Sequence, residues 1–177
     1  MHISFCPRGV LQVDDARITF KNFEGRGDKY NREGDRNFVL VLDPNDLTAE
    51  TINGTRLAGD AVIEALQAEG WNITIKPPKE GYDEPFNYLK VKIKFNDRGP
   101  KVYVKSGRAV NELTESTVGM LDQMDIAGID MDIRPYDWEM SDGKSGRTAY
   151  LQSIHVIQAL DRFAARYSDR DNEAPFA

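Results

Sequence analysis

Lysine and tyrosine alternate with apolar residues in two segments near the middle of the chain, YLKVKIKF (88–95) and KVYVK (101–105). Because successive side chains of a β-strand point to opposite faces, each strand has one apolar face and one polar face. The polar faces carry Tyr88, Lys90, Lys92, Lys94, Lys101, Tyr103 and Lys105. Cations that follow phosphates, with rings that stack on bases, are what single-stranded nucleic acid requires. The alternative is a solvated sheet face whose lysines maintain solubility.

A second group of basic and aromatic residues lies in residues 21–37, KNFEGRGDKYNREGDRN. The members that suit nucleic acid are Lys21, Phe23, Arg26, Lys29, Tyr30, Arg32 and Arg36. The segment lies between two predicted strands, where oligonucleotide-binding (OB) barrels carry a contacting loop, and its glycines predict a mobile loop. The alternative is a solvated hairpin loop in which four acidic residues pair with the basic ones. These four are Glu24, Asp28, Glu33 and Asp35.

The predicted strand at residues 129–139 adds Arg134, Tyr136 and Trp138 on one face. Trp138 is a candidate stacking platform, although a large ring near a hairpin more often packs against its neighbours.

Catalytic chemistry has little support in this sequence. Two histidines and one cysteine, Cys6, do not make a standard zinc site. Asp130 and Asp132 share a strand face and could bind a divalent metal, but a solvated acidic edge is the simpler interpretation. We therefore expect no enzyme activity and no cofactor, with a metal-dependent nuclease kept as an alternative.

Most of the segments that must position these residues have the pattern of strands. Strands are predicted at 10–23 (with Ile18 and Phe20 facing inward), 37–42, 71–76, 88–95, 101–105, 126–139 and 147–157, and helices at 58–69 and 115–124. This order predicts a mainly β fold, an OB-like five-stranded barrel with elaborations, with a β-sandwich as the alternative. We expect one domain over residues 1–160 and a flexible acidic tail over 161–177.

The net charge of −6 is unevenly distributed over the 177 residues. Residues 76–108 hold nine basic and four acidic side chains, whereas residues 109–177 carry a net charge of −7. An acidic protein with a basic middle segment can present a confined basic surface, and polybasic, histone-like proteins are excluded. The single cysteine and the lack of an apolar run of about 20 residues predict a reducing, cytoplasmic location.

Three stretches resemble single-stranded DNA-binding proteins of bacteriophages: ARITFKNF (16–23), NREGDRNF (31–38) and IRPYDW (133–138). The resemblance implies an OB-fold, a basic aromatic groove and an acidic C-terminal tail that recruits partners. The tail residues in question are Asp169, Asp171, Glu173 and Phe176. Bacterial relatives end in Pro-Phe, whereas Ala177 follows Phe176 here and Arg170 interrupts the acidic residues. These differences weaken the case for partner recruitment by the tail more than they weaken the case for DNA binding.

The sequence therefore predicts a non-catalytic single-stranded DNA-binding protein of phage replication or recombination, located in the host cytoplasm. The expected partners are single-stranded DNA, replication or recombination proteins bound through the tail, and a second copy of the chain in a homodimer, with no membrane. A virion structural or interaction protein with a β-sandwich fold is the main alternative.

Overall fold

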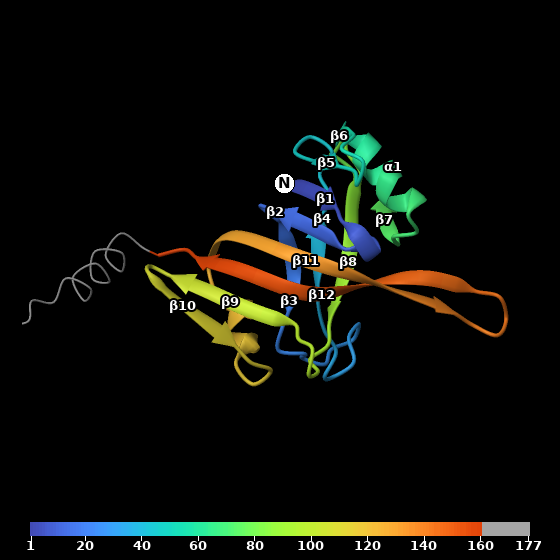
Figure 1. Cartoon of the computed structure of the whole chain (residues 1–177). Helices are drawn as coiled ribbons and strands as arrows, with labels where there is room; N and C mark the ends of the chain where they lie inside the picture. Colours follow the sequence, from blue (N-terminus) through green and yellow to red (C-terminus); the bar gives the residue numbers. More distant parts are fainter. Residues whose placement is uncertain (161–177) are drawn as a thin grey trace, which may run out of the picture.

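Strands dominate residues 1–160, the part of the chain that the computed structural model describes (Figure 1). The predicted tail over 161–177, with all four of its candidate residues, lies outside the described residues. The strands are β1 (His2–Phe5), β2 (Leu11–Asp14), β3 (Ile18–Asn22), β4 (Arg36–Val41), β5 (Thr48–Glu50), β6 (Arg56–Ala58), β7 (Ile73–Lys76), β8 (Phe86–Ile93), β9 (Lys101–Ser106), β10 (Ala109–Leu113), β11 (Ile126–Glu139) and β12 (Ser145–Gln158). The helices are α1 (Asp60–Ala68) and two 3₁₀ helices, η1 (Pro7–Gly9) and η2 (Val118–Asp122).

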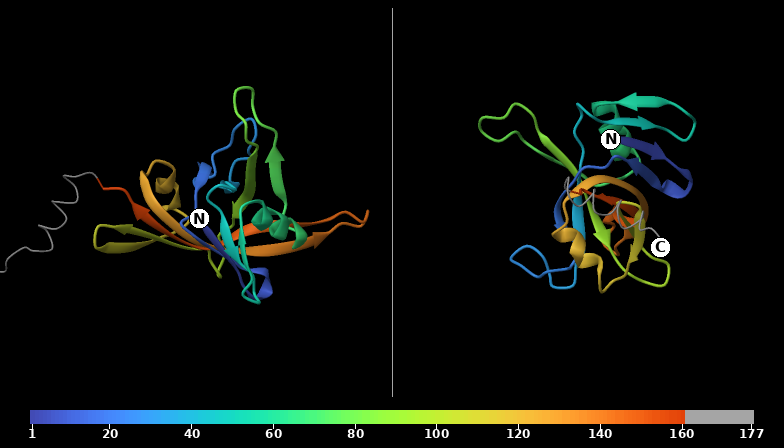
Figure 2. Two further views of the ribbon diagram at one scale, coloured as in Figure 1. Left: turned by 90° about the horizontal axis from the view of Figure 1, so that it is seen from above. Right: turned by 90° about the vertical axis from the view of Figure 1, so that its left-hand side faces the viewer.

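All of these strands belong to one mixed sheet. Most of them follow the order β3-β4-β8-β12-β11-β2-β1-β5-β6. Three more strands attach to this path, because β7 pairs with β8, and β9 pairs with both β12 and β10. The sheet curls strongly, as the end-on view in Figure 2 shows. A mainly β fold was predicted, and this part of the prediction is confirmed.

The core lies on the concave side of the curled sheet, where the apolar positions of the alternating strands meet. In β8 every second residue from Asn87 to Ile93 is buried, whereas Lys90 and Lys92 are exposed. The same alternation puts Phe38 and Leu40 of β4 fully into the core. Strand parity therefore assigns the core and outer faces of β8 as the sequence predicted.

Helix α1 covers one end of the sheet with an apolar stripe. Val62, Ile63 and Leu66 are buried at helical spacing, and the chain turns after the helix at Gly70 with φ 95°. Glycine adopts this left-handed conformation without the steric cost that a Cβ atom brings.

Two of the predicted element boundaries need correction. The segment 10–23 forms two strands, β2 and β3, rather than one, and the predicted helix over 115–124 is only the five-residue 3₁₀ helix η2. The short strands β1, β5, β6 and β10 were not predicted, because segments of three to five residues carry too little alternation to be recognised.

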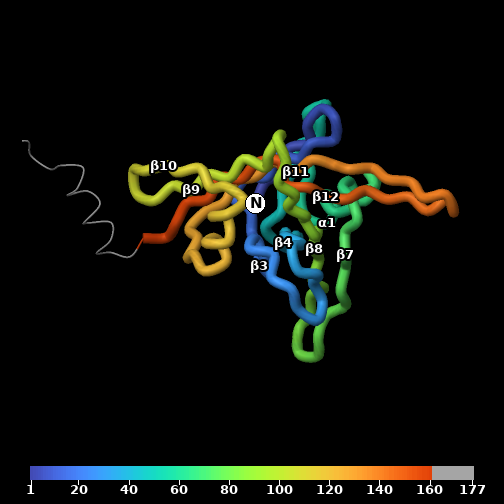
Figure 3. The backbone as a smooth tube through the Cα atoms, turned by 90° about the horizontal axis from the view of Figure 1, so that it is seen from below, coloured from blue at the N-terminus to red at the C-terminus, as the bar shows by residue number. Residues whose placement is uncertain are grey.

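Three extensions project from the curled sheet. The β11–β12 hairpin reaches far beyond the curled sheet on one side (Figure 1). The β3–β4 and β7–β8 loops both project on another side, as Figure 3 shows. Within residues 1–160, no helix has the length and apolar character needed to cross a membrane.

Candidate nucleic-acid interface

A cleft of about 580 Å³ lies between the β3–β4 loop and a projecting arm, which consists of β7, β8 and the loop that joins them. It brings together segments that are separated by some fifty residues of sequence. We call it the arm cleft, and its lining residues are Phe20, Lys21, Asn22, Arg26, Gly27, Asp28, Tyr30, Asn31, Asn37, Val39, Lys76, Phe86, Tyr88 and Lys90. Five of these were candidates from the sequence: Lys21, Arg26, Tyr30, Tyr88 and Lys90.

The wall formed by β7 and β8 presents two rings and two lysines. The rings of Phe86 and Tyr88 lie 5.3 Å apart, and both side chains are half-buried. Lys76 Nζ lies 5.6 Å from the centroid of the Tyr88 ring, and the exposed Lys90 follows on the same face. Phe86 and Lys76 were missed because they lie at the ends of their strands, outside the clear alternation. This wall combines flat apolar surface with positive charge.

The opposite side of the arm cleft is formed by Phe20 and Tyr30. Phe20 was predicted to face inward, and this is wrong: its side chain is 73% exposed. The reason is a β-bulge, since Thr19 pairs with Val39 and Asn22 with Asn37, so that two residues of β3 face one residue of β4. The extra residue shifts the alternation by one position. Phe20 itself has φ 50°, a conformation that is costly for a bulky side chain.

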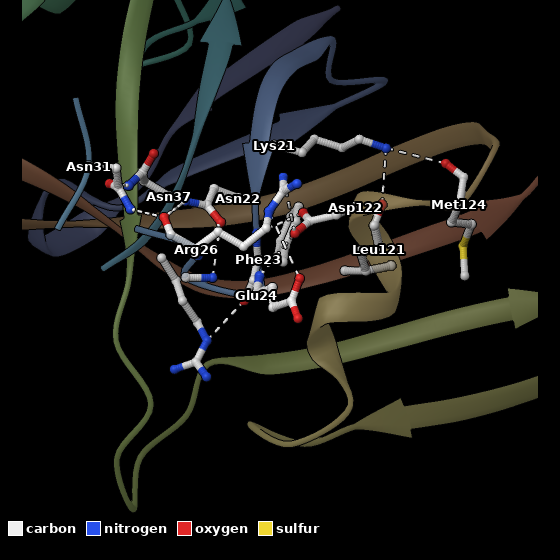
Figure 4. A network of polar contacts seen from close by, with 12 residues as sticks. Lys21, Asn22, Phe23, Glu24, Arg26, Asn31, Asn37, Leu121, Asp122 and Met124 are labelled. Atoms are coloured by element: carbon white, nitrogen blue, oxygen red, sulfur yellow. Dashed lines mark hydrogen bonds and ion pairs between the residues drawn. The ribbon is translucent and has the colours of Figure 1, made fainter. Parts of the chain in front are cut away.

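The β3–β4 loop is held in place by side-chain hydrogen bonds, as Figure 4 shows. Asn22 Oδ1 accepts from the backbone N–H groups of Gly25 and Arg26, and Asn31 Nδ2 donates to the carbonyl oxygens of Arg26, Arg32 and Asp35. The glycines of the loop led us to expect a mobile segment. The glycines also permit close contact, because a Cβ atom on Gly25 (φ 78°) would lie 3.2 Å from the backbone of Gly34.

A second anchor joins this loop to η2. The carboxylate of Asp122 accepts hydrogen bonds from the backbone N–H groups of Phe23 and Glu24, at 2.8 and 3.1 Å. Lys21 Nζ donates to the carbonyl oxygens of Leu121 and Met124 at 3.0 and 3.2 Å (Figure 4). Both contacts fix the position of the loop relative to the sheet.

The arm cleft has an excess of positive charge. Its ionisable lining residues are four cations, Lys21, Arg26, Lys76 and Lys90, and one acid, Asp28. Arg26 lies 3.9 Å from carboxylate oxygens of Glu24 and Asp122, which partly offset its charge. Among residues 1–160, no ion pair engages Lys76 or Lys90. These two lysines are available to an anionic ligand.

Other loop candidates lie beside the arm cleft rather than in it. Phe23 is fully buried and stacks on Phe38 with ring centroids 5.5 Å apart, so its ring cannot meet a base. Arg36 donates a hydrogen bond to the carbonyl oxygen of Phe23 and pairs with Glu115 at 3.0 Å, so its guanidinium is engaged by the protein itself. The exposed Lys29 and Arg32 remain in the loop near Tyr30.

Lys101, Tyr103 and Lys105 form a separate surface on β9. Strand β9 does not pair with β8; both strands pair with β12, at different points along its length. The sequence placed these lysines on a face without acidic residues, but the neighbouring strands add three: Glu112 opposite Tyr103, Asp130 opposite His155, and Asp132 opposite Ser153. Lys101 pairs with Glu112 at 3.6 Å. The positive charge of this surface is therefore offset.

The long β11–β12 hairpin carries the last three candidates. Arg134 lies 4.9 Å from the ring centroid of Tyr150, and Tyr136 meets the same ring edge-on at 6.1 Å. Trp138 is 36% exposed and packs on Gly146, where a Cβ atom would come within 2.5 Å of the indole. Trp138 lies in a different hollow, with Glu69 and Arg147, and is not part of the arm cleft.

The clearest electrostatic effect in the described residues is also on this hairpin. Arg147 donates hydrogen bonds to both carboxylate oxygens of Asp137, at 2.7 and 3.0 Å, and its charge lies 5.2 Å from the ring centroid of Trp71. These hydrogen bonds, reinforced by the positive charge, hold the pKa of Asp137 below its usual value, and they raise that of Arg147. The Asp137–Arg147 pair joins the two strands of the hairpin, and Arg147 also contacts Trp71, which precedes β7.

The candidate metal ligands Asp130 and Asp132 have other partners. Asp130 Oδ1 accepts a hydrogen bond from the backbone N–H of Asp15 at 2.9 Å, and Asp132 Oδ2 accepts one from Ser153 Oγ at 3.3 Å. Within residues 1–160, no group of three or more His, Cys, Asp or Glu side chains is placed to hold a metal ion.

A curled mixed β-sheet with a cleft lined by cations and rings is typical of OB-like binding proteins. The sequence matches the family model of the phage ssDNA-binding domain over residues 3–174, so the chain belongs to this family. The resemblance found in the sequence is thereby confirmed. A comparison with curated proteins gave no significant match.

Two solved structures have a similar fold. The C-terminally truncated single-stranded DNA-binding protein of bacteriophage Enc34 is 15% identical, with a TM-score of 0.52 over 89% of this chain and 90% of that one. The untruncated protein is 14% identical, with a TM-score of 0.50 over 97% of this chain and 93% of that one. These similarities confirm the OB-like fold that the sequence predicted.

Proposed function

We propose that this protein binds single-stranded DNA in the arm cleft without catalysing a reaction, and that it acts in phage DNA replication or recombination in the host cytoplasm. Family membership and an OB-like fold both support this proposal. The observation that carries it is the arm cleft itself, in which four aromatic rings and four cations from three strands and a loop surround one groove. Replication proteins recruited through residues 161–177 and a homodimer remain predictions from the sequence.

The cleft residues divide into two roles. Lys76 and Lys90, with Arg26 opposite, neutralise phosphates, because cations along a groove follow the backbone of the strand. Tyr88 and Phe86 on one side, and residues Phe20 and Tyr30 on the other, offer ring surface to bases. Stacking tolerates any base, since every base has a π-face. The expected binding is therefore independent of sequence and sensitive to salt.

The backbone of Phe20 gives independent support. A bulky residue with φ 50° costs about 1–3 kcal/mol, and such strain is found most often where function requires it. Here the strained residue places an aromatic ring in solvent at the edge of the arm cleft, where it contributes little to the core. The bulge exposes this ring, and stacking on a base gives a functional reason for a strained, exposed aromatic residue at this position.

A matched pair of tyrosine variants tests this assignment. Tyr88→Ala should weaken binding of oligo-dT roughly 5- to 150-fold, which corresponds to about 1–3 kcal/mol for one stacked base. Tyr103→Ala, the same substitution at the half-buried equivalent position of β9, should leave the affinity unchanged. Fluorescence anisotropy with labelled oligo-dT provides the affinities, and thermal unfolding shows whether each variant is folded. Equal effects of the two substitutions contradict the assignment.

A charge variant at an exposed position covers the case in which Tyr88→Ala fails to fold. Lys90→Gln should reduce the slope of log affinity against log salt by about 0.7, the value for one phosphate contact on a single strand. Arg56→Gln removes the same charge from the β5–β6 hairpin, at the other end of the strand order from β3 and β4, and should leave the slope unchanged. An unchanged slope for Lys90→Gln contradicts binding in the arm cleft.

A further inference from the structure

A row of side chains leads out of the arm cleft across four neighbouring strands. We propose that bound DNA follows this row to a second stacking site on the β11–β12 hairpin, formed by Arg134, Tyr136 and Tyr150. This inference rests on the proposed function of the arm cleft and extends its substrate to strands longer than the cleft itself holds.

The register of the sheet makes the row continuous. Asn37 of β4 lines the arm cleft and pairs with Lys92 of β8, Lys92 pairs with Tyr150 of β12, and Tyr150 pairs with Arg134 of β11. Paired residues of neighbouring strands project from the same face, so these four side chains lie side by side on the outer face of the sheet. Lys92 is exposed and lies two residues after Lys90, which connects the row to the cation of the cleft.

The far end of the row is an ordered aromatic site. Tyr136 meets the Tyr150 ring at an interplanar angle of 89°, and the Arg134 guanidinium lies over that ring at 4.9 Å. Tyr136 remains 53% exposed even with these contacts. A ring that is held in place by its neighbours but open to solvent can stack on a base with little loss of side-chain freedom. Arg134 adds a positive charge for the adjacent phosphate.

The charges along β11 give the path a direction. Toward the start of β11, the residues on the same face as Arg134 are Asp132 and Asp130, whose carboxylates repel phosphates. Toward the hairpin, the next residue on that face is Tyr136. DNA that reaches Arg134 is therefore directed along the hairpin, away from the β9 surface.

The row adds substantial length to the binding site. Neighbouring strands lie about 4.8 Å apart, so the three spacings from β4 to β11 span about 14 Å. A stacked strand rises about 3.4 Å per nucleotide, so this distance holds about four nucleotides. The two sites therefore differ in the oligonucleotide length that they require.

Two lengths of oligo-dT, about 5 and about 15 nucleotides, separate the second site from the first, since both lie near the range of OB-fold site sizes. We expect the full chain to bind the longer probe more tightly than the shorter one. Tyr136→Ala should lower the affinity for the longer probe about 5-fold or more and leave the affinity for the shorter probe unchanged. Tyr136→Phe keeps the ring and should behave as the wild type. Ile52→Ala removes an apolar side chain of similar exposure from the β5–β6 turn and serves as the control.

The outcomes distinguish this inference from the proposed function. If the wild type binds neither probe, the proposed function is wrong. If both probes bind, but Tyr136→Ala leaves the affinity for the longer probe intact, the arm cleft stands and the second site is wrong. Loss of both probes by Tyr136→Ala in a folded protein also contradicts the inference, because Tyr136 then acts within the first site.

Discussion

The side-chain amide of Asn37 donates a 2.9 Å hydrogen bond to Asn31 Oδ1, and so joins the floor of the arm cleft to the loop that forms its edge. Asn31 in turn donates to three backbone carbonyl oxygens of that loop. One half-buried side chain thus determines the shape of a segment that carries Arg26 and Tyr30. The loop is arranged for binding before DNA arrives, which reduces the entropy that binding would otherwise cost.

We expect Asn31→Ala to loosen the loop and weaken DNA binding while the rest of the fold persists. A typical intramolecular hydrogen bond contributes about 0.5–1.5 kcal/mol, so losing this set should reduce local stability by about 2 kcal/mol. Amide hydrogen exchange of the loop should accelerate by about an order of magnitude or more, which corresponds to that free energy. Asn53→Ala, in the turn after β5, removes another asparagine that bonds within its own turn and is the control. Unchanged exchange in the loop of Asn31→Ala contradicts this account.

Phe20→Gly should separate binding from stability. Glycine relieves the left-handed conformation that costs a bulky residue about 1–3 kcal/mol, although its own backbone freedom offsets about 0.5–1 kcal/mol of that gain. The variant should therefore be at least as stable as the wild type in urea unfolding, yet bind oligo-dT roughly 5-fold or more weakly. A variant that is less stable but binds normally shows that the ring serves the fold and not the ligand.

Acid should break the Asp137–Arg147 pair and thereby change the surroundings of Trp71, which Arg147 contacts. The pKa of Asp137 is lowered in the folded protein, so its contribution to stability is present above the unfolded value of 3.8 and is lost as the pH falls through the lower folded value. The raised pKa of Arg147 has no effect in this range, because the group stays charged. The fluorescence of Trp71 in a Trp138→Phe background should change in this window. Asp137→Asn should remove this change; an identical acid transition in that variant shows that the pair is not its cause.

Strand parity explains why much of the fold and one wall of the arm cleft could be predicted. Strand β11 begins and ends where the sequence indicated, and the outer face of β8 carries Tyr88, Lys90 and Lys92 as expected. These features depend on local alternation, which a single sequence displays.

The remaining features depend on pairing between distant segments. Phe20 was misplaced because a bulge, which only the register with β4 reveals, shifts the alternation of β3. The lysines of β9 looked unopposed because Glu112 and Asp132 come from strands whose positions in the sheet are not evident from sequence. Tyr150 was missed for the same reason, because only the pairing of distant strands places it beside Lys92 and Arg134.

Amide hydrogen exchange of the full chain with and without saturating oligo-dT shows which surface of the protein holds the DNA. DNA should slow exchange in the two segments that line the arm cleft, residues 20–39 and 76–90, and should leave the β9–β10 hairpin unchanged. Protection that appears on β9 and β10 while both arm-cleft segments exchange as in the free protein would contradict binding in the arm cleft.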